Sequence, residues 1–247
     1  MTERLPVGAA PTDVSHPLYT YAAHYPDVVR AGSLRNALQA AADRARRGLW
    51  YGLTSSPGWR HVAAKVVADG REATVLLVGA DERTFVVDCW ARGIHMATGR
   101  TQDLAAVAGA TGSWAGGVRV RELTEQWSFL STWDLAEAHE RGEAVPARWQ
   151  SMRRYRHRHG TDWQDLVEAA FAEPRLRALS PGSSVGRLTF SRRVTPPICT
   201  DLPSIRPLGE GRFEVRFADG RVPRADGATA AVAAALAGLP DDAVPHP

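Results

Sequence analysis

Four side chains that could take part in chemistry fall within five positions of the stretch "LAEAHERGEAVPARW" (135–149): Glu137, His139, Glu140 and Arg141. Imidazole and carboxylate groups carry protons in acid–base catalysis, and a guanidinium binds substrate anions. On a helix, Glu137 lies one turn before Glu140 and Arg141, whereas His139 points elsewhere. Two interpretations stay open. In one, Glu137, His139 and Glu140 are catalytic and Arg141 binds substrate; in the other, these residues form a solvated helix face with a structural ion pair.

Two tryptophans precede this stretch. Trp127 and Trp133 flank a segment that passes from loop to helix. Large aromatic rings commonly form pocket walls, although most tryptophans belong to a hydrophobic core. We predict that both contribute to substrate binding, with core packing as the alternative.

Metal and nucleotide motifs are incomplete. In "HERGE", Glu143 occupies the position at which a zinc-protease helix needs its second histidine. The stretch "GATGSWAGG" lacks the glycine pattern and preceding strand of a dinucleotide site, and the chain has no phosphate-binding loop and no G-x-S-x-G elbow. We therefore expect no metal and no cofactor.

Two further features have simple structural interpretations. Cys89 lies between Val87 and Trp90 in a strand-like run, which predicts a buried, inert thiol. The basic run "RRYRHRH" (153–159) could hold a phosphate or an acidic peptide, with Tyr155 as a stacking surface. A solvated helix face is the simpler interpretation.

Composition limits the class of protein. The 247 residues are 44% hydrophobic and 23% charged, with a net charge of +3, which is typical of a globular protein and too weak for a nucleic-acid binder. The sequence has no run of about 18 apolar residues, so we expect no membrane span. The N-terminus does not resemble a signal peptide. With only two cysteines, a reduced, cytoplasmic protein is expected. Lys65 is the only lysine, so 29 of the 30 cationic residues are arginine.

The first half of the chain predicts helices around a small antiparallel sheet. Ser33 caps a predicted helix, and strand-like runs follow at 61–67, 73–78, 84–90 and 94–98. Asp69-Gly70 is a favoured hairpin turn between the first two runs. A second helix begins near Thr101.

The second half begins with helices and ends with strands. The stretch "VRVRELTEQWSFLSTWDLAEAHERG" is expected to begin extended and end helical. Residues 145–159 are expected to form a basic helix and 161–173 an amphipathic helix. "SPGSS" is interpreted as a linker. "VGRLTF" and "RFEVRF" then predict strands, and an alanine-rich helix follows.

These elements predict an α+β protein of two antiparallel sheet-plus-helix lobes joined by a helical middle segment. The predicted divisions are a flexible N-terminal arm (1–20), an N-terminal lobe (21–122), the middle segment (123–182) and a C-terminal lobe (183–247).

Several stretches carry a family resemblance. "DLAEAHERG", a tryptophan followed by "LVEAAFAEPRLRAL", "LTFSRR" leading to "DLPSI", and "AVAAALAGLP" occur in this order. From Tyr25-Pro26 to Leu239-Pro240 the chain resembles an actinobacterial family of unknown function described as natural product biosynthesis proteins. The resemblance implies a setting in specialised-metabolite biosynthesis, in some cases of peptides, but no reaction.

Two functions are compatible with these observations. The first is an accessory protein that binds a precursor peptide or a biosynthetic enzyme, since sheet edges can add a peptide strand and arginine suits acidic sequences. The second is a metal-independent tailoring enzyme, a cyclase or group-transfer catalyst, that uses acid–base residues in a pocket between the lobes to act on a small molecule. Neither nucleic acid nor membrane is an expected partner.

Overall fold

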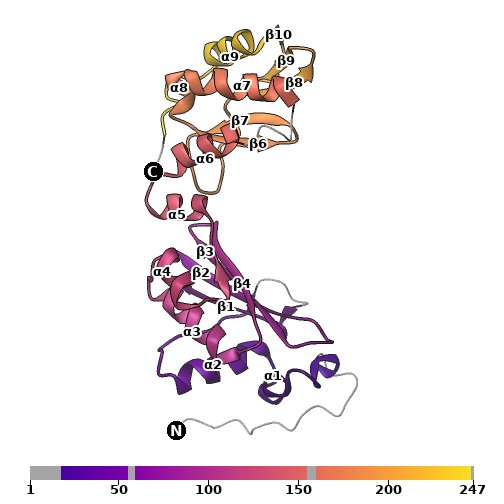
Figure 1. Cartoon of the computed structure of the whole chain (residues 1–247), viewed down its shortest axis with the longest axis vertical. Coiled ribbons are helices and arrows are strands. Elements are labelled where there is room, and N and C mark those ends of the chain that lie inside the picture. Colours follow the sequence, from indigo (N-terminus) through magenta and orange to yellow (C-terminus); the bar gives the residue numbers. More distant parts are fainter. Residues whose placement is uncertain (1–17, 55–58, 155–159, 246–247) are drawn as a thin grey trace. The chain divides into compact units, whose positions relative to one another are not determined.

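A computed structural model describes residues 18–54, 59–154 and 160–245 of the chain (Figure 1). It contains two antiparallel sheets with packed helices, which confirms the predicted α+β class. The chain divides into two compact units, 1–137 and 138–247, and this division falls inside the predicted helical middle segment. The predicted arm lies mostly outside the described residues.

The N-terminal unit is built on a sheet of strand order β1-β2-β3-β4-β5. Its strands are β1 (Ala63–Ala68), β2 (Arg71–Val78), β3 (Thr84–Ala91), β4 (Ile94–Thr101) and β5 (Leu130–Ser131). Its helices are the 3₁₀ turn η1 (Tyr19–Tyr21), α1 (Pro26–Ala31), α2 (Leu34–Arg44), α3 (Leu104–Ala115) and α4 (Val120–Gln126). Helix α5 (Asp134–Glu140) crosses the division between the units.

Local chemistry explains the first hairpin and the first long helix. Asp69 and Gly70 both adopt positive φ, 48° and 75°, as a two-residue hairpin turn requires, and β1 pairs with β2 directly across them. The Ser33 hydroxyl accepts a hydrogen bond from the Asn36 amide and caps α2. Both features confirm the predictions made from the sequence.

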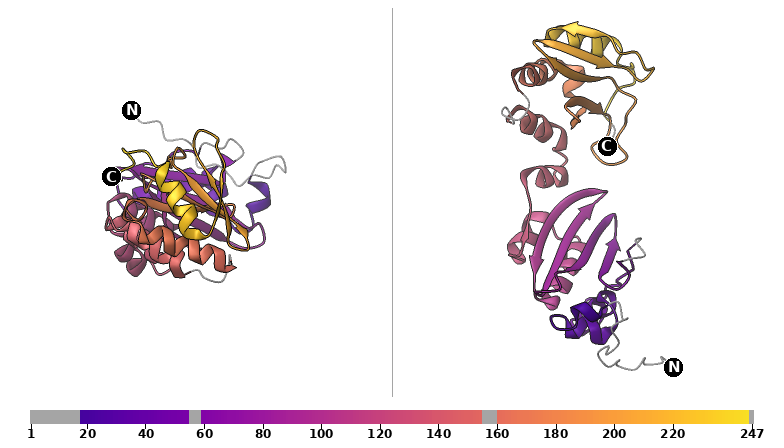
Figure 2. Two further views of the ribbon diagram at one scale, coloured as in Figure 1. Left: turned by 90° about the horizontal axis from the view of Figure 1, so that it is seen from above. Right: turned by 90° about the vertical axis from the view of Figure 1, so that its right-hand side faces the viewer.

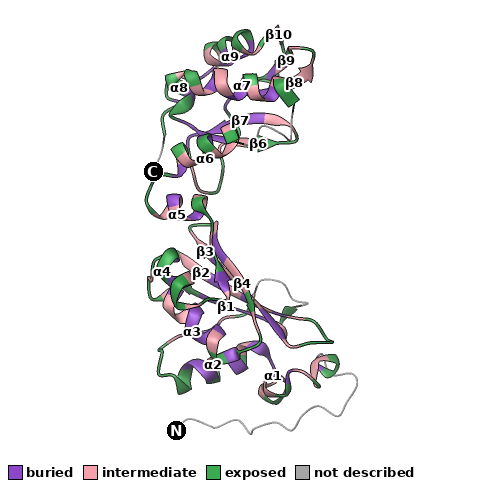
Figure 3. Ribbon diagram, in the orientation of Figure 1, coloured by how far each residue is buried: buried purple, intermediate pink, exposed green. Residues whose placement is uncertain are grey.

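Alternation along the strands places one face of this sheet against the helices. Val75, Val87 and Cys89 are among the buried residues on that face, where α3 packs across β1 to β4 (Figure 3). The opposite face carries polar side chains, among them Thr74, Asp88 and Thr98, which the strand register sets in one row.

The C-terminal unit is built on a second sheet, of order β10-β9-β8-β7-β6. Its strands are β6 (Ser180–Ser184), β7 (Arg187–Ser191), β8 (Ser204–Gly209), β9 (Arg212–Arg216) and β10 (Arg224–Asp226). Its helices are α6 (Ala144–Arg154), α7 (Gly160–Ala172), α8 (Pro174–Arg177) and α9 (Ala228–Ala237).

Helices cover one face of this sheet as well. The inward residues Leu188, Ile205 and Phe213 join Leu166 of α7 and Val232 of α9 in a single core. Figure 2 shows α9, in yellow, lying along the sheet. The amphipathic pattern of 161–173 is confirmed, because Leu166 is fully buried.

Two local predictions were wrong. "SPGSS" is strand β6 and not a linker, since pairing with β7 outweighs its turn-forming composition and an edge strand tolerates Pro181. The stretch that starts "VRVREL" begins in an extended conformation only at Arg119, because Val120 is already the first residue of α4, whose residues Val120 and Leu123 lie one helical turn apart and are both buried. The predicted basic helix corresponds to α6, which is described as far as Arg154. Residues 155–159 of the prediction lie outside the described residues.

Candidate functional site

The predicted catalytic and anion-binding residues have different surroundings. Glu137, in α5, forms an ion pair with Arg121 of α4, with 2.9 Å between Oε2 and Nη2. Arg141 follows α5 and pairs with Glu143 at 2.8 Å between Nε and Oε2, both side chains being exposed. Glu140 is half-buried at the end of α5. Neither an ion pair nor a half-buried position tests catalysis, so the catalytic roles of Glu137 and Glu140 remain predictions.

Trp127 packs inside the N-terminal unit. Its indole lies against Gly109 of α3, where any side chain would overlap the ring. Its Nε1 donates to the Ser113 hydroxyl at 3.3 Å, and Phe129 packs against it edge-on. The structure therefore shows a packing function for Trp127, and its predicted role in substrate binding stays a prediction.

Trp133 belongs to an aromatic cluster on the polar face of the first sheet. Its ring centroid lies 5.0 Å from that of His95, which stacks on Trp90 at 4.5 Å. His95 Nε2 lies 3.0 Å from Oδ1 of Asp88, and the Thr98 hydroxyl donates to the same oxygen at 2.7 Å. The sequence did not indicate His95 or Asp88 as partners, because strand register brings them together.

His139 takes part in a cluster of the C-terminal unit. Arg148 of α6 donates from Nη2 to His139 Nε2 at 3.2 Å and to the Val194 carbonyl at 3.0 Å. From Nη1 it donates to the Ser180 hydroxyl at 2.7 Å. Ser180 is buried at the start of β6. One guanidinium thus joins three segments that lie far apart in the chain.

The charge state of this cluster follows from its hydrogen bonds. A guanidinium only donates, so His139 Nε2 must accept, and the network assigns the imidazole proton to Nδ1. Burial, and then the charge of Arg148, lower the pKa of His139 to about 4. His139 is therefore neutral near pH 7. Burial also lowers the pKa of Arg148, whose described partners are all uncharged acceptors.

A second polar arrangement lies on the open face of the C-terminal sheet. Leu188 pairs with Ile205 in an antiparallel ladder, so Arg187 of β7 falls opposite Arg206 of β8. In the strand register, Glu214 of β9 lies opposite Arg206 of β8 on one side and opposite Arg224 of β10 on the other. These four residues, Arg187, Arg206, Glu214 and Arg224, are named the arginine row. They alternate with inward-facing residues and so face away from the helices.

The arginine row carries three positive charges and one negative charge. Glu214 accepts from Arg187 at 2.6 Å and from Arg206 at 3.3 Å, and the hydrogen bond from Arg187 lowers its pKa. Within the described part of the chain, Nη1 of Arg187 and Nε of Arg206 are buried without an acceptor. Like charges on neighbouring strands repel each other. The row therefore has more donors and more positive charge than its single carboxylate can compensate.

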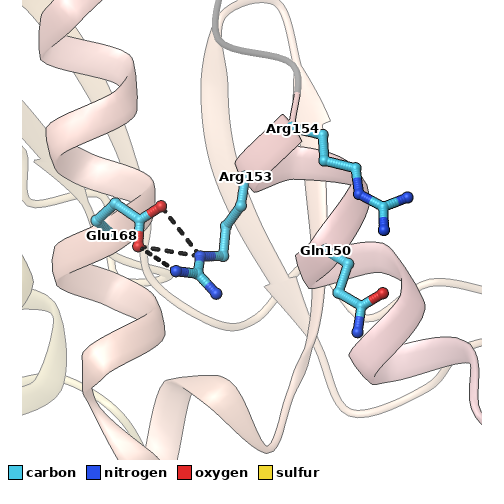
Figure 4. A pocket seen from close by; sticks show the side chains of 4 residues that line it. All are labelled: Gln150, Arg153, Arg154 and Glu168. Atoms are coloured by element: carbon cyan, nitrogen blue, oxygen red, sulfur yellow. Dashed lines mark hydrogen bonds and ion pairs between the residues drawn. The ribbon is translucent and has the colours of Figure 1, made fainter.

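A shallow depression lies between α6 and α7 (Figure 4). It measures ≈ 280 Å³ and is lined by Gln150, Arg153, Arg154 and Glu168. Arg153 points toward Glu168, which accepts from its Nε and Nη2 at 3.0 and 2.9 Å, whereas Arg154 points away. Because Glu168 already neutralises Arg153, this depression is a weaker anion site than the basic sequence suggested.

The remaining chemical groups have structural surroundings. Cys89 is buried as predicted, and burial, followed by the charge of Asp88, raises the pKa of its thiol to about 12. A thiol with so high a pKa is a poor nucleophile. In the described ranges, no three His, Cys, Asp or Glu residues gather as metal ligands would, and no helix is long and apolar enough to cross a membrane.

Fold and site together define a two-unit α+β protein whose C-terminal unit carries the arginine row and the Arg148 cluster. Residues 143–246 of this unit match a family of unknown function, DUF6193. The match includes Arg148, Ser180 and the whole arginine row, but not His139 or the N-terminal unit. No curated protein and no solved structure showed significant similarity to the chain.

Proposed function

We propose that this chain is an accessory protein of actinobacterial specialised-metabolite biosynthesis that binds an acidic segment of a partner, such as a precursor peptide. The biosynthetic setting rests on the sequence stretches that resemble natural product biosynthesis proteins. The binding function rests on the arginine row, which belongs to the segment that matches DUF6193.

The observation that carries this proposal is the unbalanced charge of the arginine row. The guanidinium groups of Arg187 and Arg206 share one carboxylate, Arg224 adds a third positive charge, and two buried N–H groups of Arg187 and Arg206 have no acceptor in the described structure. These two N–H groups are buried, so an arriving anion would contact the exposed parts of Arg206 and Arg224 and offset the excess positive charge of the row. Carboxylates suit this purpose, because a guanidinium binds them with paired, charge-assisted hydrogen bonds.

The shape of the surface favours an extended ligand. Arg187 and Arg206 lie on the neighbouring strands β7 and β8, about 4.8 Å apart, whereas β9 separates Arg206 from Arg224. All three lie on the sheet face opposite the helices. Thr189 and Ser204 are small polar residues on the same face. A peptide with several acidic side chains can therefore contact more than one guanidinium.

A binding experiment with matched variants tests the proposal. Fluorescence anisotropy compares a labelled glutamate-rich peptide with a glutamine-rich peptide of equal length. The double variant Arg206→Gln/Arg224→Gln leaves the buried Arg187–Glu214 pair in place. The control Arg30→Gln/Arg44→Gln removes two exposed arginines from the N-terminal unit.

We expect the row variant to bind the acidic peptide at least about tenfold more weakly than the wild type, while the control binds normally. Affinity should also fall with rising salt, as it does for exposed charge pairs. Equal binding of the two peptides by the wild type, or normal binding by the row variant, would refute the proposed surface.

A second candidate, a metal-independent tailoring enzyme, rests on the proximity of His139 and Arg148. The imidazole is neutral at pH 7, but its lone pair accepts from Arg148 and its pKa of about 4 makes it a weak base, so it could act as a general base only if substrate displaced Arg148. In that case Arg148 and Arg141 would bind substrate anions, and Glu140 would carry protons. Metabolite yield in the producing strain separates the candidates: His139→Ala should abolish product if the chain is an enzyme and leave it unchanged if only the arginine row is used.

A further inference from the structure

We propose that Arg148, Ser180 and His139 form a binding site for a carboxylate monoanion. This site is separate from the arginine row, and its existence does not depend on the proposed peptide partner. The inference begins with Arg148, a half-buried guanidinium of α6 whose described partners are a hydroxyl, an imidazole and a backbone carbonyl.

Arg192 in the same unit shows how a buried arginine is normally accommodated. Its side chain is 9% exposed, and it pairs with Asp201 at 2.6 Å and with Asp242 at 3.4 Å. No carboxylate of the described residues does this for Arg148. Removing a charge from water without a counter-ion costs several kcal/mol, so an anion at Arg148 would restore a large favourable interaction.

The donors of the cluster fit an oxygen anion. A guanidinium has five N–H bonds, of which Arg148 uses three. The Ser180 hydroxyl accepts from Arg148 and keeps its own proton to donate. Because His139 accepts at Nε2, its Nδ1 carries a proton that has no acceptor among the described residues. Three side chains thus retain donors, and none brings a negative charge.

The charge of the cluster selects a monoanion. Arg148 contributes +1, while His139 and Ser180 are neutral at pH 7. One carboxylate neutralises this charge, whereas a phosphate dianion would leave an excess negative charge in a half-buried site. The planar guanidinium also matches the two oxygens of a carboxylate. A small organic acid and the C-terminus of a peptide share this chemistry.

Fluorine NMR with trifluoroacetate tests the proposal directly, because this carboxylate stays ionised across the useful pH range. The wild-type protein should broaden the ¹⁹F signal in a saturable manner, and unlabelled acetate should compete. Absence of saturable broadening would overturn the proposal without any variant. Inorganic sulfate, a dianion at pH 7, should compete at least about tenfold less well than acetate, and equal competition would also overturn the proposal.

Variants locate the anion. Arg148→Gln should abolish the broadening, whereas Arg175→Gln, which removes an exposed arginine of the same unit, should not change it. If Arg148→Gln does not fold by circular dichroism, Ser180→Ala replaces it and should weaken binding severalfold. Binding that survives the folded variant would place the anion elsewhere.

The imidazole supplies a second readout. A bound anion offsets the charge of Arg148, so the pKa of His139 should rise in saturating trifluoroacetate when followed by NMR of the imidazole ring. An unchanged pKa at saturation would show that the anion does not lie beside His139. Two short peptides that differ only in a C-terminal carboxylate or amide, used as competitors, distinguish a peptide terminus from a free organic acid.

Discussion

His139 Nε2 accepts a hydrogen bond from Arg148 Nη2 over 3.2 Å, and burial together with this neighbouring cation keeps the imidazole neutral. The folded state disfavours the protonated imidazole, and the pKa of His139 falls from its ordinary value of 6.5 to about 4. This relationship couples the stability of the C-terminal unit to pH.

The first prediction concerns acid sensitivity. A pKa that is lower in the folded state means that the unfolded chain binds more protons between about pH 6.5 and pH 4, so stability falls as pH decreases through this range. The contribution of His139 amounts to about 3 kcal/mol at most. Urea unfolding of wild type and His139→Gln between pH 7 and pH 4 measures it. A stability difference between the two proteins that does not vary with pH would contradict the prediction.

The second prediction concerns the core of the C-terminal unit. Leu166 is fully buried between α7 and the second sheet, so Leu166→Asp places an unpaired charge in the core and should cost several kcal/mol. Asp165→Ala, at the exposed neighbouring position, should change stability by less than about 0.5 kcal/mol. Thermal melting compares them, and equal melting temperatures would mean that the helix is packed in another orientation.

The third prediction concerns Trp127 and Trp133, which the sequence analysis assigned to the same role in substrate binding. Trp127 packs on Gly109, so Trp127→Ala leaves a cavity and should cost about 3 kcal/mol. Trp133 is 36% exposed beside His95, and Trp133→Ala should cost less than about 1 kcal/mol. Chemical unfolding of both variants decides the point, and the reverse order of stabilities would disprove this assignment.

The fourth prediction concerns the carboxylate of the arginine row. Glu214→Gln removes the only negative charge of the row and leaves Arg187, whose side chain is 13% exposed, without a counter-ion. The expected loss of stability is about 2 kcal/mol, less than for a fully buried pair. Glu210→Gln is the control, because Glu210 forms an exposed pair with Arg212. If the two variants melt alike, Glu214 does not stabilise the row.

Sequence patterns were sufficient wherever structure depends on neighbours along the chain. The Asp69-Gly70 dipeptide predicted the first hairpin, because these two residue types readily adopt the positive φ angles found there. The spacing of Trp163, Leu166 and Ala170 predicted α7. Together with the alternating runs, these local signals determined the α+β class, because each one reflects a backbone preference or a single buried face.

Tertiary structure decided what depends on distant partners. "SPGSS" became a strand only because β7 pairs with it, and "VRVREL" became a helix because Val120 and Leu123 are buried together. The candidate sites have the same origin. Arg148 meets Val194 across 46 positions, and the arginine row exists only in the register of four strands. Contacts between distant residues leave no local pattern, so the sequence could indicate His139 as a chemical group but not the burial and the neighbouring Arg148 that keep it neutral.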